Sequence, residues 1–485
     1  MKHFRVRALY MTGTLAVGIA LLWSTETSAT STYYKEVCEI GCQYSPATCG
    51  TNCVQAAINA ITDSSATKVY TVFIDAGVIE QDTSISTNPK SYINFVGRGI
   101  GASVIRASTQ WFSNVQAGST SGNFFDLSGS TNITIRGLTI DARSKDPGTI
   151  TSTPNTFAGV KVNDVDRILF DGAEVQGLIY GLWENSGTGL IQVMNSKIGA
   201  VNFASVAGSA AWHIFASDLR AVRNGGESPV ASGDVVALDL AFGGSVDTHT
   251  AIWGSHLHAE SGDPNKSYMV AAVRAPGGSG NLDIIGSTVH LKMTTSSIGS
   301  ASRSMYALFR GAAGASTTVN IVGSDLLYET PTTAINQGRV GGIGWSAGLS
   351  TPKINLVGST IIDRGGSGGT RADLVHAPIV GGPAPTILTA GTIIKSIIST
   401  TGSLPSGIAA LAETINTRKG VATITPGPGT VAVALSPPMP DANYRVAISV
   451  NANETIWVTN KLVDGFILHS SVPTSSASVD WTVSR

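Results

Sequence analysis

The stretch NLDIIGSTVHL, residues 281–291, decides the fold, because two later stretches repeat its pattern. VNIVGSDLLYE occupies residues 319–329, and KINLVGSTIID occupies residues 353–363. Each consists of a short apolar alternation, a Gly-Ser pair and a second short apolar alternation. Weaker copies of the pattern precede them. The serines of the six copies are Ser196, Ser217, Ser255, Ser287, Ser324 and Ser359.

These serines follow one another at intervals of 21, 38, 32, 37 and 35 residues. Self-similarity at such spacings is typical of solenoids and propellers. Short strands joined by loops of variable length favour a parallel β-helix, whereas a propeller blade needs four longer antiparallel strands. In a β-helix, each coil would bend at the glycine and turn the serine inward. The repeat therefore predicts an all-β solenoid with an internal serine ladder along one edge.

The pattern of apolar and polar residues changes along the chain, and it divides the chain into five expected segments. In the last segment, apolar and polar residues alternate with turns roughly every 8–12 residues, which is typical of a small antiparallel β-sandwich. The segments are a signal peptide (1–29), a cysteine-bearing segment with a capping helix over residues 52–64 (30–66), a parallel β-helix (67–402), a linker helix (403–419) and a small β-sandwich (420–485).

The charge balance argues against a nucleic-acid partner. The chain has 31 basic and 32 acidic residues among 485, without the basic surplus that is typical of nucleic-acid binding, so we expect no nucleic-acid partner.

The N-terminal residues resemble an export signal. Basic residues come first, an apolar run follows, and the small residues Thr27-Ser28-Ala29 offer a cleavage site. We expect a secreted protein, located extracellularly, in a periplasm or at a cell surface, with no membrane span after signal cleavage.

The four cysteines all lie shortly after this signal, at Cys38, Cys42, Cys49 and Cys53. Four cysteines can bind zinc, but an exported chain favours two disulfides. The sequence leaves all three pairings open. A nested arrangement, Cys38–Cys53 around Cys42–Cys49, would close a small N-terminal cap.

The segment VYTVFIDAGVIEQDTSISTNPKSYINFVGRGIGASVIRAS, residues 69–108, resembles the opening coils of pectinesterases. More broadly, residues 69 to about 400 resemble the pectin lyase-like superfamily of right-handed parallel β-helices. This resemblance implies the fold and its handedness, and it implies binding of polysaccharide along one face. The C-terminal module resembles the small β-sandwiches that end phage tail proteins, which implies attachment or oligomerisation, for example as a trimer.

The catalytic positions of pectinesterases are not matched. Where those enzymes carry a Gln-Asp pair and then an Asp-Phe pair, this chain has Leu178-Ile179 and Asn202. An asparagine side chain cannot act as a carboxylate nucleophile or titrate as a base. The usual pectinesterase activity is therefore not expected. If the protein is an enzyme, the resemblance implies a polysaccharide-active lyase, esterase or hydrolase.

Stacking of coils turns distant residues into columns. On the third strand of successive coils we expect an outward column with Glu184, Asp239 and Arg274 as candidate catalytic residues. A carboxylate beside arginines can bind a uronate or support acid/base chemistry. A solvated row of compensating charges is the alternative. The candidate substrate-binding residues are Asn202 and Arg310 of this column and its neighbours Trp183 and Trp345, the two tryptophans as sugar-stacking platforms or as core residues.

A second column follows the Gly-Ser bend and contains Asp218, His256, His258 and His290. Residues at i and i+2 share a strand face, so the histidines should lie close together. Three imidazoles and a carboxylate can bind Zn²⁺, but histidines on a polar surface have the same spacing. We expect no metal and no cofactor.

Two functions remain. The first is a secreted β-helix protein that binds, and can process, a pectin-like or other acidic polysaccharide. The alternative is a non-catalytic surface or attachment protein of the adhesin or tailspike kind, with the solenoid as a spacer. The unmatched aspartates favour the alternative, and the charged column favours the first.

Overall fold

The structure is a computed structural model, and the statements below concern the parts of the chain that it describes. These are residues 33–117, 122–143, 157–184, 189–201, 203–208, 210–223, 233–240, 249–262, 267–275, 280–294, 304–310, 318–329, 339–345, 353–363, 375–376, 386–390, 393–396, 418–435, 442, 444–450 and 452–484. The predicted signal peptide lies outside them. So does the predicted linker helix up to residue 417. Within these ranges, no helix has the length and apolar character needed to cross a bilayer.

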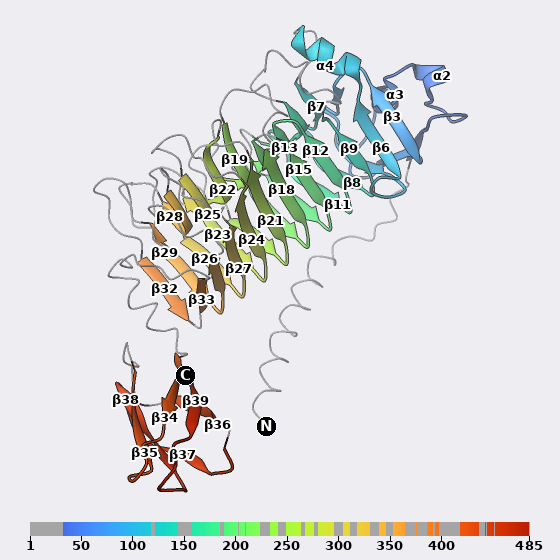
Figure 1. Ribbon diagram of the computed structural model, residues 1–485. Coiled ribbons are helices and arrows are strands. Elements are labelled where there is room, and N and C mark those ends of the chain that lie inside the picture. The colour runs from blue at the N-terminus through green and yellow to red at the C-terminus, as the bar shows by residue number, and fades with distance from the viewer. Residues whose placement is uncertain are drawn as a thin grey trace.

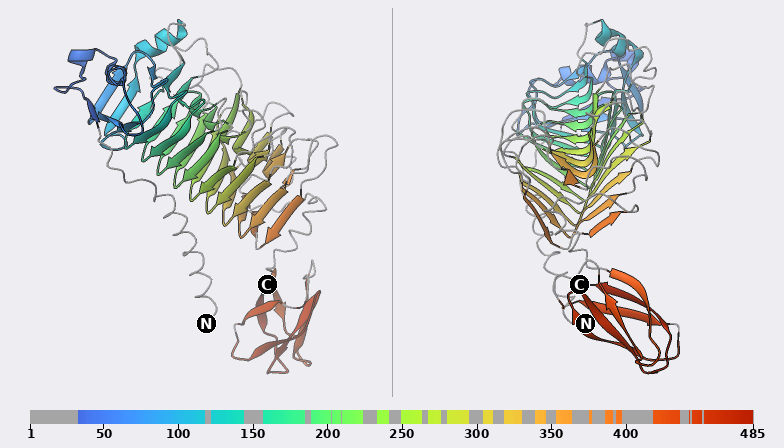
Figure 2. Two further views of the ribbon diagram at one scale, coloured as in Figure 1. Left: turned by 180° about the vertical axis from the view of Figure 1, so that it is seen from behind. Right: turned by 60° about the vertical axis from the view of Figure 1, so that its left-hand side comes forward.

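Three parallel sheets wind around one core and form a right-handed β-helix (Figures 1 and 2). The chain passes from sheet to sheet, and each strand pairs with its counterpart one coil later. Sheet 1 consists of β1 (Tyr33–Val37), β2 (Tyr70–Ile74), β5 (Ile93–Val96), β8 (Thr131–Arg136), β11 (Asp166–Asp171), β14 (Leu190–Met194), β17 (Ala211–Phe215), β20 (His249–Trp253), β23 (Asn281–Ile285), β26 (Thr318–Val322), β29 (Lys353–Val357) and β32 (Thr386–Ala390).

Sheet 2 begins after the Gly-Ser bend, and sheet 3 completes each coil. Sheet 2 consists of β3 (Gly77–Gln81), β6 (Ser103–Ala107), β9 (Thr139–Asp141), β12 (Glu174–Gly177), β15 (Lys197–Ala200), β18 (Asp218–Arg223), β21 (His256–Ser261), β24 (Thr288–Met293), β27 (Asp325–Glu329), β30 (Thr360–Asp363) and β33 (Ile393–Ser396). Sheet 3 consists of β4 (Ile85–Ser86), β7 (Asn123–Asp126), β10 (Ala158–Lys161), β13 (Tyr180–Trp183), β16 (Ala204–Ala207), β19 (Gly233–Asp239), β22 (Ser267–Ala275), β25 (Ser304–Arg310), β28 (Arg339–Trp345) and β31 (Val375–His376).

The bend between sheets 1 and 2 explains why the repeat contains glycine. Gly254, Gly286, Gly323 and Gly358 have φ values of 54°, 57°, 55° and 56°, which lie in the left-handed region. Glycine adopts this conformation without a steric cost from a Cβ atom. In an earlier coil, Ala216 has a φ of 45° at the same place, so the bend is kept even where glycine is not.

The predicted serine ladder is confirmed. The backbone N–H of each serine donates to the hydroxyl oxygen of the serine one coil later, at 3.1–3.2 Å, from Ser196 through to Ser359. Each hydroxyl donates in turn to a carbonyl two residues earlier, as Ser287 does to Ile285 at 2.9 Å. These serines are buried. The ladder therefore satisfies the buried backbone groups that a sharp bend would otherwise leave unpaired.

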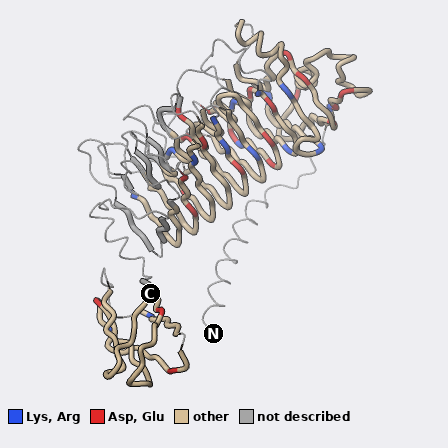
Figure 3. The backbone as a smooth tube through the Cα atoms, in the orientation of Figure 1, with Lys and Arg blue, Asp and Glu red and all other residues tan. Residues whose placement is uncertain are grey.

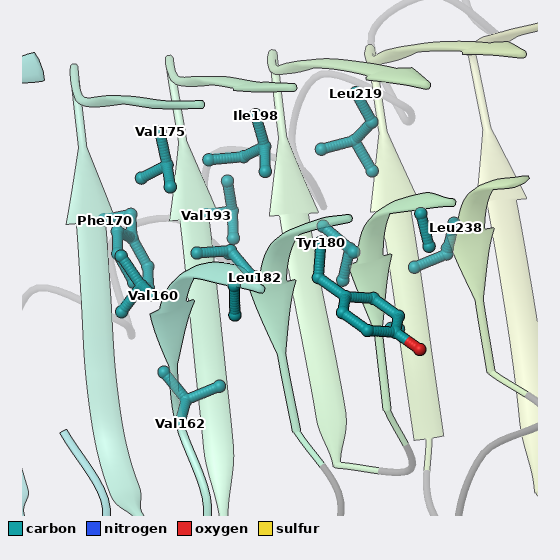
Figure 4. Packing of buried hydrophobic residues seen from close by; sticks show 14 of the residues in the cluster. Val160, Val162, Phe170, Val175, Tyr180, Leu182, Val193, Ile198, Leu219 and Leu238 are labelled. Carbon is teal, nitrogen blue, oxygen red and sulfur yellow. The ribbon is translucent and has the colours of Figure 1, made fainter. Parts of the chain in front are cut away.

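Apolar side chains fill the interior in rows that follow the axis. On sheet 2, Leu219, Leu257 and Val289 stack at matched register positions and are fully buried. Figure 4 shows how such rows from the three sheets meet in the middle of each coil. Alternate residues of the same strands face outward, which places polar side chains on the outer surface.

Helices and disulfides lie at the N-terminal end. The predicted capping helix is present as α3 (Cys53–Asn59), which buries Val54, Ala57 and Ile58, and it follows the short α2 (Pro46–Cys49). A further helix, α4 (Thr109–Gln116), buries Trp111, Phe112 and Val115. The disulfides join Cys38 to Cys42 and Cys49 to Cys53. The nested pairing is therefore wrong, since each bridge closes a local loop.

The C-terminal module is an antiparallel β-sandwich of two three-stranded sheets with a core of its own. One sheet contains β34 (Arg418–Thr423), β36 (Arg445–Val450) and β39 (Ser478–Ser484), and the other contains β35 (Thr430–Ala434), β37 (Ile456–Leu462) and β38 (Gly465–Ser470). Since β34 begins at Arg418, the last two residues assigned to a linker helix are strand.

Candidate functional site

The structure brings together two of the predicted catalytic residues on sheet 3. Asp239 ends β19 and lies opposite Arg274 of β22. The guanidinium Nε donates to Asp239 Oδ1 at 2.6 Å, and a second guanidinium nitrogen donates to Oδ2 of the same carboxylate. The remaining nitrogen donates to Asp234 Oδ2 at 2.9 Å. Arg274 is therefore held by two carboxylates of the protein itself.

This pair is buried, so the alternative of a solvated row of compensating charges is wrong for Asp239 and Arg274. The side chain of Asp239 is 0% exposed and that of Arg274 is 14% exposed. Burial acts to lower the pKa of Arg274, but the carboxylates of Asp239 and Asp234 outweigh it and raise that pKa. The arginine stays charged and its fork is occupied, so the geometry suits a structural ion pair better than a uronate-binding group.

Glu184 and Trp183 lie two coils before Asp239 on sheet 3. Trp183 shares a register row with Ala207 and Asp239, so Glu184 is one residue beyond the row. Glu184 is fully buried, and its Oε2 accepts a hydrogen bond from the backbone N–H of Ala210 at 2.9 Å. Trp183 is half-buried, and its ring lies beside that of Tyr180 with 5.8 Å between the centroids.

The other predicted substrate-binding residues are placed only in part. The register pairs Arg274 with Phe309, not with Arg310. Arg310 therefore lies one residue beyond the row of Arg274, and it pairs with Ala275 on one side and with Trp345 on the other. For Arg310 and Trp345 the description extends to the backbone alone, and Asn202 lies outside the described residues.

Tyr180 is a buried titratable group beside the Asp239–Arg274 pair. Burial, together with the charge of Asp239, raises its pKa to about 12. The neutral phenol is therefore favoured by the fold relative to the unfolded chain, in which the pKa of tyrosine is about 10.

This shift predicts a loss of stability at high pH. The contribution of Tyr180 is fully present below about pH 10 and is lost as the pH rises through about 12, up to about 2–3 kcal/mol. Urea unfolding at pH 9 and pH 11.5 measures the change. The Tyr180→Phe variant is the control, and it should lose less stability over this interval than the unmodified chain. Equal losses in the two proteins would mean that Tyr180 does not titrate as the structure implies.

The outer surface of sheet 2 carries a second and denser group of polar side chains. The register places Asp218, His256 and Thr288 in one row, and Arg220, His258 and His290 in the next. The predicted column after the Gly-Ser bend is thus confirmed in its register. Figure 3 shows that acidic and basic residues recur along the coils of the solenoid.

A shallow depression lies at the edge of this surface. It has a volume of about 470 Å³ and is formed by the polar side chains of Lys197, Asp218, His256 and Thr288 together with the Gly-Ser bends. Nδ1 of His256 lies 3.1 Å from Asp218 Oδ1. The hydrogen bond to His256 lowers the pKa of Asp218 and outweighs the opposing effect of burial. The ionised carboxylate can orient the ring and keep a proton on Nδ1, so that Nε2 can accept one.

The neighbouring row is more buried than a surface position would suggest. The side chain of His258 is 8% exposed and lies 3.0 Å, through Nε2, from Glu260 Oε2. Burial lowers the pKa of His258. Burial and the nearby His258 lower the pKa of His290 to about 4. Both rings are therefore neutral at pH 7, so the interpretation of these residues as solvated surface histidines is wrong.

Sequence reasoning missed several residues of this surface. Lys197, Glu260, Lys292 and Glu329 all face the same side as the histidines. The signal was present: Glu260 follows His258 by two residues, and Lys292 follows His290 by two. Lys197 also occupies the position after the repeat serine that Asp218 and His256 occupy in later coils.

Comparisons with known proteins give weak likenesses. No family model matches the chain, and no curated protein matches its sequence. The tailspike of Pseudomonas phage phi297 is 12% identical, with 86% of this chain and 67% of the tailspike covered and a TM-score of 0.39. A tailspike of Pseudomonas phage LKA1 is 13% identical, with 88% and 92% covered and a TM-score of 0.35. A pectin methylesterase from Erwinia chrysanthemi is 14% identical, with 58% and 80% covered and a TM-score of 0.34.

The strand order defines the architecture without these comparisons. From β2 onward, each of the three parallel sheets takes every third strand of the solenoid, which can arise only if the chain winds repeatedly around one axis. The chain is a right-handed parallel β-helix protein with a C-terminal β-sandwich.

Proposed function

We propose that the protein binds an acidic polysaccharide along the outer surface of sheet 2, with the depression at Lys197, Asp218 and His256 as the principal contact. The observation that carries this proposal is the depression itself, whose lining includes the cation Lys197, the imidazole of His256 beside Asp218, and Thr288. Ligand sites are typically concave with a few convergent polar groups. Successive coils repeat about every 4.8 Å, so an extended polymer can contact several of them.

Lys197 is the group expected to attract a uronate, because Arg274 is already held by Asp234 and Asp239. Replacing Lys197 with alanine should weaken binding of an acidic glycan about 10- to 100-fold, the range for a hydrogen bond to a charged group. Isothermal titration against a panel of acidic and neutral oligosaccharides measures this. Lys353→Ala is a matched control, since Lys353 is an exposed lysine at the start of β29 on sheet 1. Equal effects of the two variants, or none, would contradict the proposal.

Processing of the glycan is a further part of this proposal. With Nδ1 of His256 bonded to Asp218, Nε2 is placed to act as a general base toward a bound sugar. The same oligosaccharides, incubated with the protein, should then yield unsaturated products, reducing ends or methanol. Binding without any of these products would restrict the function to recognition.

Attachment through the C-terminal module is a second candidate function. The β-sandwich exposes several large apolar side chains: Val421, Trp457, Leu462, Val463 and Val472. Exposed apolar side chains mark an interaction site where they form one contiguous patch. The glycan panel separates the two functions, because attachment alone leaves oligosaccharide binding undetectable and the Lys197 variant unchanged.

A further inference from the structure

Three imidazoles meet on the outer surface of sheet 2. His256 and His258 alternate on β21, and His290 lies opposite His258 on β24. One nitrogen from each of the three rings lies within 4.8 Å of the other two. The centroids of the His258 and His290 rings are 4.6 Å apart.

Each imidazole has a carboxylate partner of its own. Nδ1 of His256 lies 3.1 Å from Asp218, and Nε2 of His258 lies 3.0 Å from Glu260. Nε2 of His290 lies 3.5 Å from Glu329. In metal sites, a histidine ligand usually donates its other ring N–H to a carboxylate, which fixes the tautomer and the orientation of the ring.

The closest pair of nitrogens in the cluster belongs to His258 and His290. The contact with Glu260 favours a proton on Nε2 of His258, which leaves a lone pair on its Nδ1. Nδ1 of His290 is only 3.0 Å away. Nε2 of His290 is buried and makes no hydrogen bond in the described part of the chain, so its proton is not fixed there, and either a proton or a metal ion can lie between the two Nδ1 atoms.

The distances and charges suit a metal ion. Zn–N bonds of about 2.0–2.1 Å in tetrahedral geometry place two nitrogen ligands about 3.3 Å apart, close to the observed 3.0 Å. Asp218, Glu260 and Glu329 lie around the cluster, and so do two cations, Arg220 and Lys292. Each imidazole therefore has a carboxylate oxygen within 3.5 Å of one of its nitrogens.

We propose that His256, His258 and His290 form a binding site for one divalent transition-metal ion of the Zn²⁺ class. Nδ1 of His258, Nδ1 of His290 and Nε2 of His256 are the ligand atoms. A bound metal ion occupies Nε2 of His256, so the general-base role proposed for that atom belongs to the metal-free protein. The three carboxylates are positioning groups that hold the rings. Three nitrogen ligands leave a fourth tetrahedral position for water or a substrate oxygen. The proposal does not depend on glycan binding.

The test uses the full chain without a polyhistidine tag, freed of metal by dialysis against a chelator. Titration with Co²⁺ should give the visible absorption bands of a tetrahedral ion, saturating near one equivalent. Competition of Zn²⁺ against a chromophoric chelator measures affinity. His258→Gln combined with His290→Gln should weaken binding by at least about 100-fold, and Glu260→Gln should weaken it about 10- to 100-fold.

His249→Gln is the matched control, because His249 also pairs with a carboxylate, Asp283, but lies on sheet 1. It should bind metal like the unmodified chain. Circular dichroism shows whether each variant is folded. If the double variant does not fold, Glu260→Gln and the Co²⁺ spectrum of the unmodified chain decide. Absence of Co²⁺ bands at one equivalent, or unchanged Zn²⁺ affinity in the variants, would overturn the proposal and assign a proton to the His258–His290 contact. These measurements contain no glycan, so they fail or succeed independently of the proposed function.

Discussion

Replacing Arg274 with alanine is expected to lower the free energy of unfolding by about 3–5 kcal/mol, the cost of leaving a buried ion without its partner. Asp239 is 0% exposed, and two of its contacts come from the guanidinium group. Asp234, 21% exposed, loses a partner as well. The loss should exceed that for an ordinary surface charge because water cannot reach Asp239 to replace the arginine.

Denaturant unfolding followed by circular dichroism measures this loss. Arg136→Ala is the control, because Arg136 pairs with Asp171 at 2.9 Å but is 59% exposed. An exposed pair of this kind contributes about 0–1 kcal/mol. If both variants lost the same small amount, Arg274 would have to be solvated and available to a ligand, and sheet 3 would again be a candidate binding face.

Replacing Trp111 with alanine should cost about 3–5 kcal/mol, the range for large aromatic residues in a core. Trp111 is 0% exposed in α4. Its ring makes edge contacts with the rings of Phe112, Phe124 and Phe157, with 4.8, 5.4 and 5.9 Å between the ring centroids. Its indole N–H also donates to Ser84 Oγ at 3.1 Å. The substitution removes the ring through which α4 contacts Phe124 of β7 and Phe157.

Trp457→Ala provides the comparison for Trp111. Trp457 is 44% exposed in the C-terminal β-sandwich, where its ring stacks on His469 with 5.3 Å between the centroids. Thermal unfolding should show a clear decrease in the midpoint for Trp111→Ala and little change for Trp457→Ala. A similar midpoint in the two variants would show that α4 contributes little to the stability of the solenoid.

The fold was predictable because residues with a fixed role in the coil recur in the sequence once per coil. The left-handed bend requires glycine or a tolerant residue, and the serine after it must satisfy buried backbone groups, so this pair of positions recurs at each bend from Ser196 to Ser359. Residues at these positions have few alternatives. The rows after the bend were predictable for the same reason, since Asp218, His256 and Thr288 keep a fixed distance from the repeat serine.

The site on sheet 3 was not predictable in the same way. Its strands follow loops of variable length, so no fixed distance from the serine sets their register. A one-residue error moves a side chain to the other face of a strand. Glu184 and Arg310 were misplaced by one residue in this manner. Nor does composition reveal that Asp239 is buried, because burial depends on what covers the outside of the sheet. The disulfide pairing was likewise open, since spacing alone allows three arrangements.

The Gly-Ser bend makes the length of this protein adjustable in discrete steps. Every serine offers the same acceptor to the coil before it and uses the same donor toward the coil after it. Excision of residues 255–286 would join Gly254 to Ser287 and so keep the Gly-Ser dipeptide that also occurs at the next two bends, Gly323-Ser324 and Gly358-Ser359. Ser217 would then meet Ser287 as it now meets Ser255. The rod would become shorter by about 4.8 Å while its cross-section stayed the same, so evolution can alter its reach by gaining or losing whole coils.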